Sequence, residues 1–197
     1  MTKINNPYIN REISWLSFNA RVLQEAEDPT VPLFERIRFV GIFSNNLDEF
    51  FRVRVASVRR MVDIGTDEKL IGGIRPEDLH EQIMEIVVSQ QKRSQEIFRN
   101  IIKELKEENI LMVDETDLEP EQIVFVKNYF KDKVLPNLIP IMLSKENKFP
   151  YLRDRSVYLA IKLSRKARPE KFAYALVRIP NISLSRFLVL PEKEGRK

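Results

Sequence analysis

The sequence predicts an α+β fold, in which an antiparallel helical bundle is followed by a partial α+β domain. Apolar residues recur at helical spacing through the first half of the chain, whereas apolar and polar residues alternate in the last third. Hydrophobic residues make up 43% of the 197 residues and charged residues 31%, which is sufficient for a buried core. We therefore expect two domains, residues 1–108 and residues 109–197.

The first predicted helix begins after Asn10, a residue type that favours the N-cap, and ends at Asp28-Pro29. Its apolar residues approximate a helical stripe comprising Ile13, Leu16, Phe18, Val22, Leu23 and Ala26. Pro32 suits the first position of a second helix, because the backbone N–H that proline lacks is not needed there. The core candidates of that helix are Leu33, Ile37, Phe39, Val40 and Phe43.

A polar trio, Ser44-Asn45-Asn46, then interrupts the apolar pattern. The pattern leaves open whether the trio divides two helices or kinks one. The next segment has the apolar positions Leu47, Phe50, Phe51, Val55, Val58, Met61 and Val62. Three glycines, at positions 65, 72 and 73, indicate a loop, after which Pro76 begins a long helix to about Glu108. Its expected inner face comprises Leu79, Ile83, Ile86, Val87, Ile97, Ile101 and Leu105.

The second domain is predicted to contain one helix and three strands. Pro120–Val134 has a helical pattern, and Ile110–Val113 is a short apolar run before it. Strand-like alternation covers Val157–Ser164, Phe172–Ile179 and Phe187–Leu190. Three strands and one helix make a thin domain, so we expect that only part of a domain is present.

Composition argues against several classes of site. The chain has no cysteine, which rules out disulfides, thiol nucleophiles and cysteine zinc ligands. It has neither a GxxxxGK[ST] nor a GxGxxG motif for phosphate binding. The net charge of +4 is too small to indicate nucleic-acid binding, and no apolar run is long enough to span a membrane. Residues 1–10 are polar, so no signal peptide is expected.

Few titratable residues suggest catalysis. His80 is the single histidine, and its place near the start of a helix beside Asp78 predicts a surface or half-buried position without a catalytic role. The adjacent pair Asp48-Glu49 would point about 100° apart on a helix, so we interpret it as first-turn acids.

Four arginines follow the polar trio, at positions 52, 54, 59 and 60. Arg52 and Arg59 are seven residues apart and share a helix face that could attract phosphate groups. We favour the alternative of a solvated face that pairs with nearby acids. A nucleic-acid-binding function would rest on these arginines alone.

Asn46 is the most informative residue of the polar trio, and its spacing supports two interpretations. Asn46-x-x-Glu49 resembles a capping box, with Asn46 as the N-cap and Glu49 reaching back. Alternatively, the Asn46 amide offers both donor and acceptor groups, which suits the edge of an adenine ring. Spacing alone favours the cap.

Three segments closely resemble the N-terminal domain of the polyphosphate kinase family. They are residues 10–19 (NREISWLSFN), residues 21–26 (RVLQEA) and residues 38–54 (RFVGIFSNNLDEFFRVR). The later Tyr129-Phe130, Pro140-Ile141, Tyr158-Leu159-Ala160 and Ile179-Pro180 resemble the start of the family's head domain. The resemblance therefore covers nearly the whole chain.

The resemblance implies an enzyme that reversibly transfers the terminal phosphate of ATP to polyphosphate through a phosphohistidine, with Mg2+. It implies that Asn46 contacts the ATP base, because Asn46 matches the second asparagine of the family's SNNLDEF segment. The catalytic histidine and the Mg2+ ligands are implied to belong to later domains, and His80 matches no family motif. We therefore expect this chain alone to be inactive.

The resemblance also implies a location and partners. It implies a cytoplasmic protein, with peripheral association with the inner membrane as an open alternative. The complete enzyme is expected to be a homo-oligomer, a dimer or tetramer, with dimer contacts in the head domain. The alternative function is a non-catalytic helical protein-interaction module.

Overall fold

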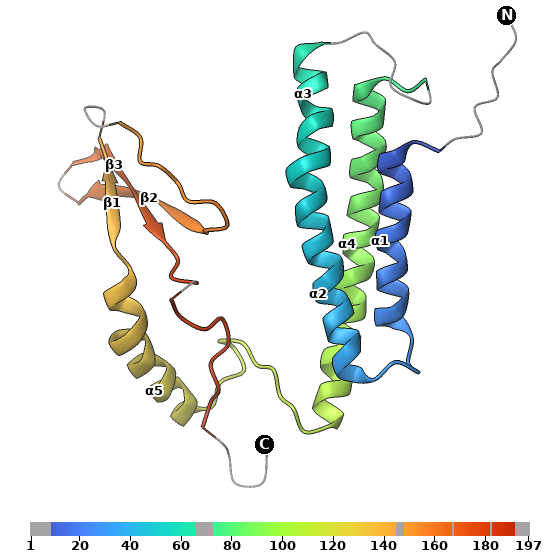
Figure 1. Ribbon diagram of the computed structural model, residues 1–197. Coiled ribbons are helices and arrows are strands. Elements are labelled where there is room, and N and C mark those ends of the chain that lie inside the picture. Colours follow the sequence, from blue (N-terminus) through green and yellow to red (C-terminus); the bar gives the residue numbers. More distant parts are fainter. Residues whose placement is uncertain (1–8, 66–72, 145–147, 167, 182, 192–197) are drawn as a thin grey trace, which may run out of the picture. The chain divides into compact units, whose positions relative to one another are not determined.

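The computed structural model describes residues 9–65, 73–144, 148–166, 168–181 and 183–191. The chain divides into two compact units between Met112 and Val113. Within the described residues, the first unit is helical, and the second combines helix with a three-stranded antiparallel sheet (Figure 1). The predicted α+β fold is confirmed.

Local capping signals set the ends of the first unit's helices. Helix α1 spans Arg11–Glu27, and the side chain of Asn10 accepts a hydrogen bond from the Glu12 backbone N–H at 2.9 Å, as a predicted N-cap should. Helix α4 spans Pro76–Glu107, with its proline in the first turn. Helix α2 spans Leu33–Phe50, so Pro32 is its N-cap and not its first helical residue as predicted.

The polar trio does not interrupt the helix that contains it. Helix α2 continues through a π-helical turn, η1 (Phe51–Val55), into α3 (Ala56–Ile64). The backbone at both junctions is in the right-handed helical region, with φ −63° at Phe51 and φ −57° at Ala56. Asn46 therefore lies inside α2, and the capping-box prediction is wrong, as is the first-turn position of Asp48-Glu49.

Three helical rods pack around one core in the first unit. Helix α1 packs against α2 and α4, and α4 also packs against α3, with successive rods running in opposite directions (Figure 1). The buried core comprises Leu16, Leu23, Ala26, Phe43, Leu47, Phe50, Val55, Val58, Leu79, Ile83, Val87, Ile97, Ile101 and Leu105. Phe18, predicted to lie on the inner stripe, is 57% exposed, because its position on α1 is beside the buried stripe and not within it.

The second unit begins with α5 (Pro120–Tyr129), which continues through η2 (Phe130–Val134) and η3 (Leu135–Asn137). Strands β1 (Pro140–Leu143), β2 (Tyr158–Arg165) and β3 (Arg168–Arg178) follow, in the spatial order β1-β3-β2. Strands β2 and β3 are the first two predicted strands. The third prediction was wrong, since Phe187–Leu190 forms no strand, and its short alternation has no hydrogen-bonded neighbouring strand in the described part of the chain.

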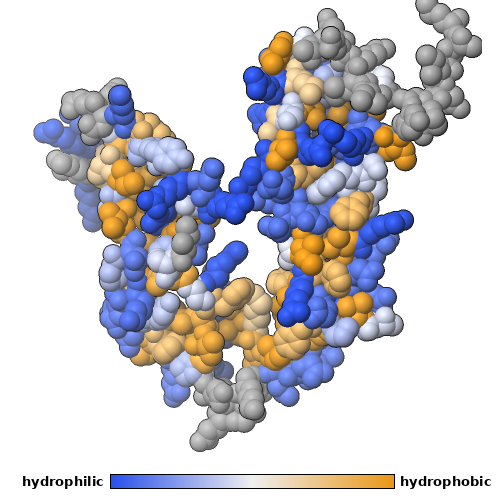
Figure 2. All heavy atoms as spheres, in the orientation of Figure 1, coloured by the Kyte–Doolittle hydropathy of each residue, from blue (hydrophilic) through white to orange (hydrophobic). Residues whose placement is uncertain are grey.

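The sheet of the second unit is apolar on both faces. The register places Ile141 beside Leu176 on one face and Leu159 beside Val177 on the other. Ile141 and Leu159 are nevertheless exposed, and hydrophobic residues gather on the visible surface of this unit (Figure 2). The sheet therefore offers apolar surface that the described residues leave uncovered.

Candidate functional site

Asn46 lies on α2 where that helix packs against α1. Its Nδ2 donates a hydrogen bond to Oδ1 of Asn19 on α1, at 3.1 Å. Asn19 is completely buried, and its own Nδ2 donates to the backbone carbonyl of Phe43 at 3.3 Å. Two side-chain amides and one helix carbonyl thus form a polar chain across the interface between the two helices.

The hydrogen bonds between these groups leave part of the Asn46 amide free. Its Oδ1 accepts no hydrogen bond from any residue that the structure describes, and it is not among the buried side-chain atoms that lack a partner. Because Asn46 is only half-buried, this oxygen reaches the surface. The Nδ2 carries two hydrogens, of which the bond to Asn19 uses one. Asn46 therefore keeps a free acceptor oxygen at the surface and one donor hydrogen that Asn19 does not use.

An aromatic stack fixes the same helix interface next to Asn46. The Trp15 ring on α1 lies 4.5 Å from the Phe50 ring, centroid to centroid, with the planes only 8° apart. The Phe51 ring meets Phe50 edge-on at 6.4 Å. These contacts hold α1 and α2 together one helical turn from the asparagine pair, which limits the movement of the Asn46 backbone.

A buried carboxylate follows at the end of this interface. Glu12 is buried, and its Oε1 accepts hydrogen bonds from the Arg11 side chain, the shorter at 2.9 Å. Arg54 on η1 lies 3.7 Å from the same oxygen. The other oxygen, Oε2, is buried and has no hydrogen-bond donor among the described residues. Arg54 therefore balances the charge of Glu12 and is not displayed as a free phosphate ligand.

The remaining arginines of the run fit the solvated-face interpretation in part. Arg52 pairs with Asp48 at 2.7 Å, one turn earlier on the same rod. Arg59 and Arg60 are exposed on α3. Two of the four arginines thus pair with nearby acids, as the favoured alternative expected.

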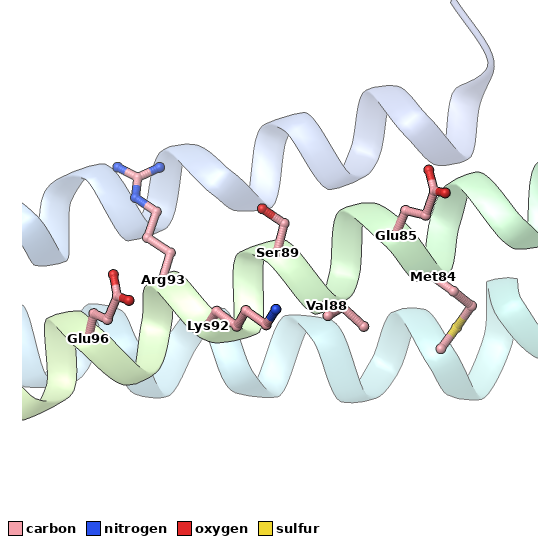
Figure 3. Close-up of a pocket in the computed structure, with 7 residues that line it drawn as sticks. All are labelled: Met84, Glu85, Val88, Ser89, Lys92, Arg93 and Glu96. Atoms are coloured by element: carbon pink, nitrogen blue, oxygen red, sulfur yellow. The ribbon is translucent and has the colours of Figure 1, made fainter.

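A surface hollow on α4 does not include Asn46. It is a shallow groove of about 700 Å³, lined by Met84, Glu85, Val88, Ser89, Lys92, Arg93 and Glu96. Figure 3 shows that all seven side chains project from successive turns of α4 alone. Arg93 is paired with Glu27 of α1. The groove mixes both charges with apolar groups and does not gather polar groups from separate elements, so it is a poor candidate for a specific ligand site.

A smaller hollow of about 280 Å³ lies where the turn before α2 meets the end of α4. Arg36 is buried at this point, and its Nε donates to the Ala26 carbonyl at 2.9 Å. Its NH1 donates to Oε2 of Glu104 at 2.6 Å. This arginine ties the ends of all three rods together, which is a structural role.

His80 is half-buried on α4, within the range predicted from its position. Across the described ranges, no three histidine, aspartate or glutamate side chains come together in a group that could hold a metal ion. None of the helices that the structure describes is long and apolar enough to cross a membrane.

Sequence reasoning missed Asn19, although a signal was present. Asn19 lies three residues after Leu16 and four before Leu23, so it occupies a position of the buried stripe. A polar residue on a buried helix face needs hydrogen-bond partners, and those of Asn19 are the Phe43 carbonyl and the Asn46 amide. Gln90 on α4 shows the same signal, and its Nε2 donates to the Leu16 carbonyl at 3.0 Å.

Comparison with known proteins covers both units. Residues 8–113 match the family model of the polyphosphate kinase N-terminal domain, and residues 121–197 match that of the polyphosphate kinase middle domain. The chain is 43% identical over 195 residues to a polyphosphate kinase of Vibrio cholerae, a match that covers 96% of this chain and 26% of the relative. It is 37% identical over 195 residues to a polyphosphate kinase of Thermosynechococcus vestitus, with the same coverage.

A solved structure agrees with these sequence matches. The crystal structure of polyphosphate kinase from Porphyromonas gingivalis superposes with a TM-score of 0.77 at 33% sequence identity. The superposition covers 95% of this chain and 27% of that structure. The chain thus spans about a quarter of the length of the relatives that it matches.

Proposed function

Because the chain belongs to the polyphosphate kinase family, and carries its N-terminal and middle domain regions, we propose that it supplies the nucleotide-base contact of a polyphosphate kinase. The complete enzyme, in this proposal, reversibly transfers the terminal phosphate of ATP to polyphosphate. The observation that carries the proposal is the Asn46 amide, which has a free acceptor oxygen at the surface and one donor hydrogen that the bond to Asn19 does not use.

The free groups of Asn46 complement adenine. An asparagine amide pairs with adenine by accepting from the exocyclic amine and donating to an adjacent ring nitrogen. Ile42 lies one helical turn before Asn46 on the same side of α2, and its side chain is exposed. It offers apolar surface on which the flat base can rest beside the amide.

The phosphoryl chemistry belongs, in this proposal, to residues outside the two units described here. The family's reaction passes through a phosphohistidine, and His80 is held half-buried on α4 with no part in the Asn46 site. Mg2+, when bound to the complete enzyme, neutralises charge on the transferring phosphate groups. We therefore expect the purified chain to form no polyphosphate from ATP, and synthesis by the chain alone would contradict this division of roles.

Protein contacts are the second contribution that we propose, and the exposed apolar faces of the sheet favour it. Self-association of the complete enzyme in the cytoplasm would cover such faces, because apolar surface of this kind is uncommon on isolated domains. A purely non-catalytic interaction module would have the same apolar faces, but its binding to a partner protein would not depend on nucleotide.

The test is the substitution Asn46→Ala in the complete enzyme. We expect the KM for ATP to rise about 5- to 10-fold with little change in kcat, because the base contact is made equally in the ground state and the transition state. Asn45→Ala is the matched control, since Asn45 is the exposed neighbour with the same side chain. If Asn46→Ala leaves the KM for ATP unchanged in a folded enzyme, the base-binding role is wrong.

A further inference from the structure

We infer that Asn19 is a positioning residue that makes the site select adenine over guanine, by fixing which way the Asn46 amide faces. The inference rests on the base-binding role proposed for Asn46. It adds a residue from a second helix that contacts no nucleotide itself. Asn19 acts through Asn46, to which it is hydrogen bonded at 3.1 Å.

The orientation of both amides follows from one backbone carbonyl. The Phe43 carbonyl oxygen can only accept a hydrogen bond, so Asn19 must turn its NH2 group toward it. The Nδ2 atom of Asn19 lies 3.3 Å from this oxygen. The Oδ1 of Asn19 then faces Asn46. Because that oxygen also can only accept, Asn46 must present its own NH2 group, which leaves Oδ1 of Asn46 free at the surface.

Burial makes this arrangement resistant to reversal. Asn19 is 0% exposed, so water cannot replace the bonds that a reversed amide would lose. Turning the Asn19 amide over would bring its oxygen against the Phe43 carbonyl oxygen. Turning the Asn46 amide over would bring its oxygen against that of Asn19. Either reversal leaves buried acceptors facing each other without a proton between them.

A fixed amide can distinguish two bases that a free amide cannot. Adenine presents a donor amine next to a ring acceptor, whereas guanine presents an acceptor oxygen next to a ring donor. An unrestrained asparagine serves either base by turning its amide through 180°. With its NH2 group held by Asn19, Asn46 keeps its acceptor where adenine offers a donor and guanine offers a second acceptor.

The test compares kcat/KM for ATP with kcat/KM for GTP in the complete enzyme carrying Asn19→Leu. Leucine has nearly the same size and cannot hold the Asn46 amide. We expect the ATP:GTP ratio to fall about 10-fold, mainly through KM, because a bidentate base contact discriminates by about this factor. A merely structural role would lower activity with both nucleotides equally and leave the ratio unchanged.

Gln90→Leu is the matched control, because Gln90 is also buried and also bonds a carbonyl of α1, that of Leu16. It should leave the ATP:GTP ratio unchanged. If Asn19→Leu does not fold, Asn19→Ala measures the same ratio with a smaller side chain. An unchanged ratio in a folded Asn19 variant, with a raised KM in Asn46→Ala, overturns the inference and leaves the proposed function standing. An unchanged KM in Asn46→Ala overturns both.

Discussion

Replacing Glu104 with methionine should destabilise the helical unit more than replacing both Glu104 and Arg36 with methionine. The Arg36 side chain is 6% exposed and that of Glu104 is 41% exposed, with 2.6 Å between them. Removing only the carboxylate leaves a buried guanidinium whose remaining hydrogen bond, among the described residues, is to the Ala26 carbonyl of α1. Removing both charges leaves two apolar side chains that can pack against each other.

The expected magnitudes follow from this asymmetry in burial. Breaking a fully buried ion pair costs about 3–5 kcal/mol. Glu104 is partly exposed, and a hollow of about 280 Å³ gives water access to the pair. We therefore expect about 2–3 kcal/mol for Glu104→Met. The double variant should lose about 1 kcal/mol or less, mainly for the Ala26 carbonyl left without its donor.

Trp15 provides the assay. It is the single tryptophan of the chain and is stacked on Phe50 in the core of the helical unit, so its fluorescence reports on the unfolding of that unit alone. Urea unfolding of the wild type, both single variants and the double variant gives the free energy of unfolding for each. In thermal unfolding, each kcal/mol corresponds to about 4–8 °C for a unit of this size.

The coupling between the two positions decides the outcome. If the double variant is less stable than Glu104→Met, or if the two single effects simply add, Arg36 is not a buried charge that depends on Glu104, and the reasoning from burial is refuted.

Two further predictions concern the core and a turn. Phe50→Ala should lower the free energy of unfolding by about 3–5 kcal/mol, measured by circular dichroism in urea, because Phe50 is buried. Phe18→Ala should change it by less than about 0.5 kcal/mol, because Phe18 is exposed, and similar effects of the two substitutions would contradict the assigned burial. Thr30→Val should raise the pKa of Asp28 toward its ordinary 3.8, because the hydrogen bond from the Thr30 hydroxyl is the main cause of the lowered pKa. NMR titration measures this change, and the lowered pKa of Asp114, which depends on Thr116, is the control that should not move. Ionised Asp28 stabilises the fold above its ordinary pKa, and this contribution is lost as the pH falls through the lowered value, so a pKa of Asp28 that does not move in Thr30→Val would contradict the assignment.

The elements that the sequence predicted well are those with local signals. Asn10 caps the start of α1 and Pro76 begins α4, because a cap or a first-turn proline acts on the residues next to it. Strand β1 was missed for the opposite reason. It is four residues long and is stabilised by hydrogen bonds to β3, more than 30 residues later in the chain.

Asn46 shows why the site was harder to predict than the fold. Its spacing to Glu49 is that of a capping box, but the same spacing occurs inside helices, where it carries no such meaning. Its environment is set by Asn19, 27 residues earlier in the sequence. Pattern analysis within one helix could not supply that partner, whereas a polar residue on the buried stripe of α1 could have indicated it. The base-binding role of Asn46 came from family resemblance and stays a prediction.

The π-helical turn at Phe51–Val55 has an evolutionary consequence. A π turn holds one residue more than the α turn that it replaces, while the helix on either side keeps its phase. Losing one residue there would convert the turn to ordinary α-helix and leave Val58 facing α4. Losing one residue elsewhere in α2 or α3 would rotate everything beyond it by about 100° and expose the core. Descendants of this sequence can therefore shorten the long rod at this turn without rebuilding the bundle.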